Sequence, residues 1–179
     1  DFGNDGGNGF ADNPFARPTI RYDFDIMGFG LSVSSNRDLT DVGVGTGLSL
    51  SDYSRNTQLC GVDISEPMLR RALKRVREFG LSNVETLAVM DAKNLAFKDS
   101  CFDAVVAQYV ITAVPDPERT LDDFIRVLKP GGELILVNHI GAESGPRRVF
   151  ELAFAPLARR LGWRPEFPWE RLTNWAAKH

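Results

Sequence analysis

Apolar and polar positions follow a regular pattern between about residues 38 and 137, and this stretch predicts most of the fold. Short runs of leucine, valine and isoleucine predict five strands, separated by turns or by helical patterns. The strands are expected to run up to Asp41 and to cover 59–62, 84–88, 102–107 and 133–137. The run at 102–107 is strongly apolar, so it is expected in the centre of the sheet.

Helical spacing of apolar residues separates several of these strands. A helix is expected to begin near residues 46–48, a second to cover about 65–79 and stop at Gly80, and a third to cover about 117–128 before a turn at 129–132. Alternation of strands and helices produces parallel strands joined by right-handed crossovers. The pattern therefore predicts an α/β fold with an open, mostly parallel sheet.

The two ends of the chain show a different pattern. Glycine, asparagine and aspartate dominate the first residues, so 1–35 is predicted to be a flexible or lid-like segment before one domain over 36–179. Residues 146–162 predict a further helix, with a kink at Pro156. We find no further strand pattern after residue 137.

Composition narrows the class of protein. Of the 179 residues, 43% are hydrophobic and 25% are charged, which is ordinary for one soluble globular domain and excludes a collagen-like or disulfide-framework protein. The two cysteines, Cys60 and Cys101, lack metal-binding spacing and are expected to be buried thiols in a reducing compartment. No metal site is therefore expected, and no apolar run approaches the ~20 residues that span a bilayer.

Charge is distributed unevenly along the chain. Residues 1–140 contain 14 Lys and Arg against 20 Asp and Glu, whereas residues 141–179 contain seven against four. A protein that binds nucleic acid would spread basic residues over a whole face, so no nucleic-acid partner is expected. The basic tail is compatible with an anionic surface or a phosphate, and equally with a solvated basic helix.

A glycine-rich loop carries the first candidate chemistry. Residues 41–47 read D-V-G-V-G-T-G and lie between a predicted strand and a predicted helix, where glycines permit a sharp turn and the close approach of a ligand. Asp63 ends the next strand, 22 residues after Asp41. A carboxylate there can accept hydrogen bonds from the ribose hydroxyls of an adenosine-containing cofactor.

Two classes of cofactor fit this outline, and one fits better. Dinucleotide binding requires G-x-G-x-x-G, but the third position is Leu48, which argues against an NAD-dependent oxidoreductase. The observed acid-x-G-x-G-x-G resembles motif I of the class I S-adenosylmethionine-dependent methyltransferases. Asp41 also suits a cofactor with a positive amino group better than a pyrophosphate, which a carboxylate repels. A glycine-rich turn without a ligand is the alternative.

Further segments extend this resemblance over roughly residues 38–140. They are the segments 90–92, 102–106 and 126–132. The resemblance implies S-adenosylmethionine as cofactor and a Rossmann-like three-layer sandwich, and it leaves open whether the sheet includes the last strand pair of that fold. The cofactor-binding residues that it implies are Asp41, Gly43, Gly45, Thr46, Gly47, Asp63, Ile64, Met68, Asp91, Ala92 and Gln108.

A narrower resemblance concerns the substrate. It rests on segments 41–50, 136–139, 145–147, 155–156 and 161–163, and on 15–17 followed by 22–23. These are similar to soluble bacterial phosphatidylethanolamine N-methyltransferases, which methylate a lipid amine stepwise to phosphatidylcholine. The resemblance implies a phospholipid substrate and a cytoplasmic enzyme held peripherally on the anionic surface of the inner membrane, with 1–35 as a lid or membrane-contact segment.

Five residues are candidates for catalysis or substrate binding. Methyl transfer needs an unprotonated amine, and His139, at the end of the last strand, has a side chain whose pKa suits a proton acceptor. The ring of Tyr22 can face a cationic head group, Asn138 is implied as a substrate contact, and Arg147 and Arg148 can bind a phosphate. The alternatives are a surface histidine, a tyrosine packed in a lid, and a cationic helix start.

Other functions fit the same fold. The first alternative is a methyltransferase for a soluble or quinone-like small molecule, which would need no lipid surface. The second is a non-catalytic module that binds S-adenosylmethionine without turnover.

Overall fold

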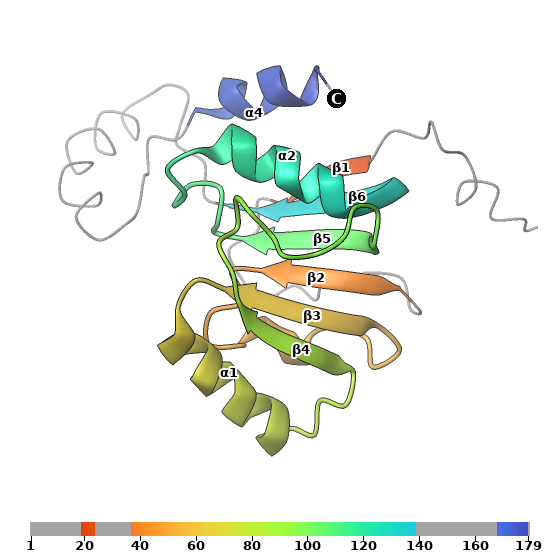
Figure 1. Cartoon of the computed structure of the whole chain (residues 1–179), viewed down its shortest axis with the longest axis vertical. Helices are drawn as coiled ribbons and strands as arrows, with labels where there is room; N and C mark the ends of the chain where they lie inside the picture. Colours follow the sequence, from red (N-terminus) through yellow and green to blue (C-terminus); the bar gives the residue numbers. More distant parts are fainter. Residues whose placement is uncertain (1–18, 24–36, 139–167, 179) are drawn as a thin grey trace, which may run out of the picture.

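A computed structural model describes residues 19–23, 37–138 and 168–178 of the chain. Its centre is a six-stranded, fully parallel sheet in the order β1-β6-β5-β2-β3-β4 (Figure 1). The strands are β1 (Thr19–Asp23), β2 (Asp38–Val42), β3 (Gln58–Asp63), β4 (Val84–Val89), β5 (Phe102–Gln108) and β6 (Leu128–Val137). The helices are the 3-10 turn η1 (Ser49–Ser51) and the α-helices α1 (Glu66–Glu78), α2 (Pro117–Val127) and α4 (Trp169–Ala176).

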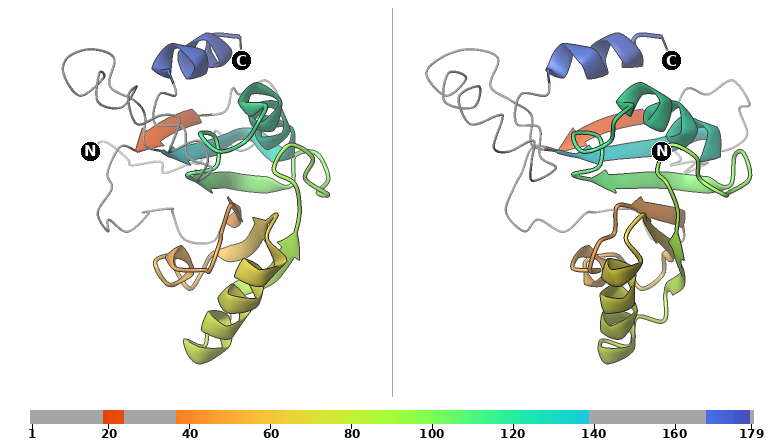
Figure 2. Two further views of the ribbon diagram at one scale, coloured as in Figure 1. Left: turned by 90° about the vertical axis from the view of Figure 1, so that its left-hand side faces the viewer. Right: turned by 60° about the vertical axis from the view of Figure 1, so that its left-hand side comes forward.

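The sheet is covered by helices on both faces, which confirms the predicted three-layer α/β fold. Side chains on β5 alternate between the faces: Val105 and Ala107 belong to one apolar cluster, and Ala104 and Val106 belong to the other. Residues of α2 and α4 fill the first cluster, and residues of α1 fill the second. Figure 2 shows α4 beside α2 and distant from α1. The strongly apolar β5 lies between β2 and β6, as its composition predicted.

The predicted helices at 65–79 and 117–128 are present as α1 and α2. Both carry a proline in the first turn, where a missing backbone N–H costs nothing. The Asp116 side chain accepts a hydrogen bond from the backbone N–H of Arg119 and caps α2. Gly80, at a φ of 56°, follows the end of α1.

The prediction of a helix beginning near residues 46–48 was wrong. This part of the chain forms only the single 3-10 turn η1. Gly47 has a φ of 76°, a left-handed conformation that no α-helix continues through. Serines at the turn also compete for the backbone: the Ser51 hydroxyl donates to the Leu48 carbonyl. The result is a short, tight connection rather than a helix.

The last strand is longer than the sequence predicted. Residues 129–132, expected as a turn before the strand, lie within β6 as an irregularity, because the pairing with β5 shifts from Phe102↔Leu128 to Ala104↔Glu133. Gly131 has a φ of 73° at this point. Such a bulge lets a strand continue past a turn-forming sequence.

Two elements were not predicted at all. Strand β1 pairs in parallel with β6 from Thr19↔Glu133 to Asp23↔Val137, and thereby forms the edge of the sheet. Helix α4 packs through Leu172 and Trp175, both nearly fully buried. Within the described ranges no strand follows β6, and β1 holds the sheet edge beside it. The helix expected at 146–162 lies outside these ranges.

Candidate functional site

The glycine loop between β2 and η1 is fixed to the neighbouring strand by its own backbone. The N–H groups of Gly43 and Val44 both donate to the carbonyl of Val62 on β3, at 2.8 and 3.1 Å. A Cβ atom on Gly43 would lie 2.3 Å from Cγ2 of Val110, and one on Gly47 would lie 2.9 Å from Cβ of Ala72 on α1. Packing within the protein therefore requires glycine at both positions.

Gly45 is different, because the space beside it is open. A Cβ atom there would have no neighbour nearer than the Gly43 carbonyl at 3.8 Å and the Met68 sulfur at 3.9 Å. Its φ is 55°, and its N–H donates to Oδ2 of Asp63 at 2.8 Å. Thr46, the next residue, is half-buried. Gly45 thus gives the loop an open side at which a ligand can meet the backbone.

Asp41, at the end of β2, is a completely buried carboxylate. Its Oδ2 atom accepts hydrogen bonds from the Ser49 hydroxyl at 3.0 Å and from the Tyr53 hydroxyl at 2.9 Å. Its Oδ1 atom has no hydrogen-bond partner among the described residues. Burial raises the pKa of Asp41 to about 7, against the opposing effect of the two hydroxyls. A cationic donor at Oδ1 would satisfy this carboxylate.

Asp63, at the end of β3, has its two oxygens on backbone donors. Oδ2 accepts from Gly45, and Oδ1 accepts from the N–H of Ser65 at 2.8 Å. Each carboxylate oxygen can accept two hydrogen bonds, so one position on each remains for a ligand hydroxyl. Two apolar side chains lie close by in sequence and are exposed, Ile64 by 71% and Met68 by 46%. Exposed apolar side chains next to a carboxylate that can still accept hydrogen bonds suit a nucleoside, which has an apolar base face and ribose hydroxyls.

The segment after β4 carries the remaining predicted cofactor residues, Asp91 and Ala92. Asp91 forms a bridge with Asn94, and its Oδ1 accepts from the N–H of Lys93 at 3.1 Å. Both predicted residues are partly exposed. Their placement depends on how the following chain is anchored.

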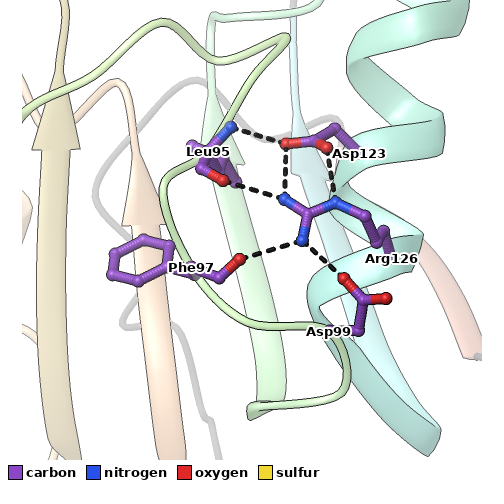
Figure 3. A network of polar contacts seen from close by, with 5 residues as sticks. All are labelled: Leu95, Phe97, Asp99, Asp123 and Arg126. Atoms are coloured by element: carbon purple, nitrogen blue, oxygen red, sulfur yellow. Dashed lines mark hydrogen bonds and ion pairs between the residues drawn. The ribbon is translucent and has the colours of Figure 1, made fainter.

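Arg126 of α2 provides that anchor (Figure 3). Its guanidinium donates to the carbonyls of Leu95 and Phe97, at 2.8 and 2.9 Å, and to the Asp99 carboxylate at 2.8 Å. Asp123 accepts from Nε of Arg126 at 2.7 Å and also from the N–H of Leu95 at 2.6 Å. One side chain thus fixes the loop that leads from Asp91 to β5.

Two amide side chains lie at the carboxyl ends of β5 and β6. Gln108 is the last residue of β5 and is opposite Val137, and Asn138 directly follows β6. Nε2 of Gln108 and both amide atoms of Asn138 are buried without a hydrogen-bond partner in the described part of the chain. Buried polar atoms are nearly always paired in native proteins, so these atoms mark a place for a polar ligand.

Sequence reasoning missed three residues of this region. Ser49 and Tyr53 hold Asp41, and their roles depend on the turn η1 where a helix was predicted. Burial, and next the charge of Asp41, raise the pKa of Tyr53 well above its usual value. The third is Tyr109, exposed by 48% directly after the central strand. A large aromatic residue at the carboxyl end of a buried strand was the available indication.

The structure brings most predicted cofactor residues to one edge of the sheet. Asp41, Asp63 and Gln108 end adjacent or nearby parallel strands, and the glycine loop lies between them. Tyr22 lies in β1 opposite Leu136, and only its backbone is described. His139, Arg147 and Arg148 lie outside the described residues.

Three further expectations concern composition. Across the described ranges, no group of three or more His, Cys, Asp or Glu side chains could hold a metal ion. No helix there has the length and apolar character needed to cross a bilayer. Cys60 and Cys101 are free thiols but only half-buried, rather than buried as predicted. Burial raises the pKa of both thiols, which makes them poor nucleophiles.

The chain is similar to known methyltransferases in sequence and in structure. The family profile described as "Methyltransferase domain" matches residues 40–136. Phosphatidylethanolamine N-methyltransferase of Cereibacter sphaeroides is 45% identical over 133 residues, which are 74% of this chain and 66% of that protein. Demethylmenaquinone methyltransferase of Bacteroides fragilis is 34% identical over 104 residues, 56% of this chain and 42% of that protein. The chain therefore spans less than two thirds of these relatives.

A solved structure adds a case with bound ligands. Phosphoethanolamine N-methyltransferase 2 of Haemonchus contortus, in complex with phosphomonomethylethanolamine and S-adenosylhomocysteine, is similar with a TM-score of 0.68 and 27% identity. The alignment covers 83% of this chain and 34% of that one.

Proposed function

The chain belongs to the S-adenosylmethionine-dependent methyltransferases with the class I fold, and from this premise we propose that it methylates the amine of phosphatidylethanolamine and of its mono- and dimethyl forms. The observation that carries the proposal is the similarity to the Cereibacter sphaeroides enzyme, which extends over more of the chain than the family profile does. The unpartnered amide of Asn138 supports it, because it offers polar contacts for a head group at the carboxyl end of β6.

We assign the cofactor to the loop side of the sheet edge. S-adenosylmethionine supplies a methyl group on a sulfonium centre, a good leaving group that makes positioning the main task of the protein. In our assignment Oδ1 of Asp41 meets the amino group, and Asp63 accepts from the ribose hydroxyls. Ile64 and Met68 cover the adenine base, and Asp91 and Ala92 line its rim.

The protein must also present the amine without its proton. The ammonium group of the acceptor first gives up a proton, and the freed nitrogen lone pair then forms the new N–C bond as the S–C bond breaks. His139 is our candidate to accept that proton. Asn138, which is buried and unpartnered, is the candidate to orient the head group together with Tyr22.

We also propose that the enzyme works at a membrane surface. Arg147 and Arg148 are candidates for the lipid phosphate, because a guanidinium matches phosphate geometry. The N-terminal segment 1–35 and the basic residues of 141–179 are candidates for contact with anionic lipid on the cytoplasmic side of the inner membrane. Membrane contact would then bring the enzyme to its substrate.

A second candidate substrate is a quinone-like small molecule. The observation that favours it is the similarity to the demethylmenaquinone methyltransferase. Such an acceptor has no ammonium group, so the ring of Tyr22 would have no cation to face.

The test combines binding with transfer. Calorimetry with S-adenosylhomocysteine measures cofactor binding, and labelled S-adenosylmethionine is then offered with vesicles of phosphatidylethanolamine and, separately, with a demethylated quinone. Label in the lipid supports the proposal if the His139→Ala variant transfers less label than wild type while its affinity for S-adenosylhomocysteine is unchanged. Label in the quinone alone supports the second candidate, and binding without transfer to either supports a non-catalytic module.

A further inference from the structure

Tyr109 combines three properties that are seldom found together. It follows the last residue of the central strand β5, its φ is 59°, and its side chain is 48% exposed although Val110 and Ile111 beyond it are buried. A bulky residue in the left-handed region is uncommon. Such strain persists where the surroundings impose it, and it is frequent at functional sites.

The surroundings of Tyr109 explain how this backbone is held. Its N–H donates to the carbonyl of Val137 at 2.7 Å, which ties it to the end of β6. On the other side, Gly43 comes so close that a Cβ atom there would overlap Val110 and reach 3.5 Å from the Gln108 carbonyl. Tyr109 is therefore fixed between the glycine loop and the carboxyl end of β6.

The same place contains the unpartnered polar atoms. Gln108 precedes Tyr109 in the chain, and Asn138 follows the residue to which Tyr109 is bonded. Asn138 is 7% exposed, and both of its amide atoms lack a partner among the described residues. The backbone of Tyr109 is thus held at the same ends of β5 and β6 as these amide atoms, and an aromatic ring at such a place can bind an organic cation, because the ring face attracts positive charge.

We propose that Tyr109 is a specificity-determining residue that binds the substituted ammonium group of the methyl acceptor and favours acceptors that already carry methyl groups. This inference rests on the proposed function, since it names a second aromatic contact, in addition to Tyr22, for the same head group. An ammonium with more methyl groups is more weakly hydrated, so its transfer from water to the ring costs less desolvation free energy. The residue thereby favours completion of successive methylations over release of partly methylated lipid.

The test measures discrimination between acceptors. For wild type, Tyr109→Phe and Tyr109→Leu, kcat/KM is determined on vesicles of phosphatidylethanolamine and of its N,N-dimethyl form, at saturating S-adenosylmethionine. We expect Tyr109→Leu to lose about 2- to 30-fold on the dimethyl lipid and less on the unmethylated lipid, whereas Tyr109→Phe retains the wild-type ratio. Phe79→Leu changes an aromatic side chain that is 58% exposed at the end of α1, and this matched control should leave the ratio unchanged.

Tyr109→Gly separates the ring from the backbone. Glycine adopts a φ of 59° without strain, so this variant should keep or raise the melting temperature while it loses the same discrimination as Tyr109→Leu. Unchanged affinity for S-adenosylhomocysteine in both variants is also expected. A wild-type ratio in Tyr109→Leu and Tyr109→Gly would overturn the inference, and so would an equal loss of cofactor affinity and activity.

Binding measurements keep this inference distinct from the proposed function. If wild type transfers no methyl group to either lipid, the proposed function fails, but calorimetry with glycerophosphocholine in the presence of S-adenosylhomocysteine still tests the ring. Weaker binding to Tyr109→Leu than to wild type supports the inference. Equal binding, or none to wild type, overturns it.

Discussion

Polar residues at the two ends of the parallel strands differ in their pairing. We call the end at which the strands begin the amino edge of the sheet and the end at which they finish the carboxyl edge. At the amino edge, charges pair with one another: Lys129 donates to Asp38 at 2.9 Å and to Asp103 at 3.1 Å, and Arg37 meets Glu133 at 3.4 Å. At the carboxyl edge, Oδ1 of Asp41, Nε2 of Gln108 and both amide atoms of Asn138 lack partners among the described residues.

This contrast separates residues that support the fold from residues that bind. An ion pair between partly exposed side chains contributes little to stability, and its loss slightly lowers the unfolding free energy of the whole domain. A buried polar atom without a partner destabilises the free protein, and a ligand that supplies the partner removes that cost. Changes at the carboxyl edge should therefore alter binding first, and changes at the amino edge should alter stability alone.

The largest expected effect is that of Asp41→Asn on cofactor affinity. The substitution keeps the shape of the side chain but removes the charge that is assigned to the amino group. Loss of one partner of a buried charge pair typically costs a few kcal/mol, so the affinity for S-adenosylhomocysteine should fall by about 100-fold or more. Calorimetry measures it, and an unchanged affinity would exclude the assigned contact.

Alanine substitutions at Gly43 and at Gly45 should differ in their effects on stability and on cofactor binding. Gly43→Ala places a methyl group 2.3 Å from Val110 at a φ of 79°, so unfolding free energy should fall by about 3 kcal/mol in urea titrations. Gly45→Ala meets open space and should cost only about 1–2 kcal/mol from its φ. Its cofactor affinity should nevertheless fall, because the methyl group enters the space assigned to the ligand. Equal stability losses would contradict this distinction.

Arg126→Lys tests the anchor of the loop after Asp91. Lysine cannot reproduce the forked contacts with the Leu95 and Phe97 carbonyls, so we expect a loss of about 2 kcal/mol of unfolding free energy and a smaller loss of cofactor affinity. Arg70→Lys is the matched control, because Arg70 pairs with Glu66 on the exposed surface of α1. A loss in the control as large as that in Arg126→Lys would show that the anchor has no special role.

Asp41 also predicts how stability depends on pH. Its pKa in the native protein is about 7, above the ordinary 3.8, so between pH 4 and 7 the native state holds a proton that the unfolded chain has released. The contribution of Asp41 to stability is therefore greatest near pH 4, falls by up to about 1.4 kcal/mol for each pH unit up to 7, and is constant above. Asp41→Asn should remove this slope in urea titrations at pH 5, 6 and 8. A slope that survives the substitution would assign it to another group.

The smallest effect is expected at the amino edge. Lys129→Met breaks two ion pairs on a side chain that is 37% exposed, which should lower the unfolding free energy by about 1 kcal/mol. Affinity for S-adenosylhomocysteine should not change. A loss of affinity in this variant would show that the two edges are coupled.

Apolar runs and apolar periodicity predicted the parts of the fold that carry such a pattern in their own sequence. Strands β2 to β6 and helices α1 and α2 all show such a pattern, and each was predicted to within a few residues apart from the start of β6. The prediction failed at the 3-10 turn η1, because the left-handed backbone of Gly47 and the hydrogen bond of the Ser51 hydroxyl determine the conformation there. Strand β1 was not predicted, because only its pairing with β6, more than a hundred residues away, makes it a strand.

The candidate site was predictable to a similar degree. Spacing placed Asp41, the glycines and Asp63 together, because the carboxyl ends of parallel strands share one edge. Spacing could not show that Ser49 and Tyr53 both bond to the same oxygen of Asp41 and leave the other free. Nor could it show the left-handed backbone of Tyr109, which depends on a bond to the next strand.

The pairing of β1 with β6 has a consequence for synthesis of the chain. Thr19 leaves the ribosome 114 residues before its partner Glu133. At roughly 5–20 residues per second, β1 waits about 6–23 s before the strand that it joins exists. During that interval strands β2 to β5 are synthesised, and β1 still has no neighbour in the sheet. The edge of the sheet beside β6 is therefore formed by a segment that is made before the other described strands and can pair only after the last of them.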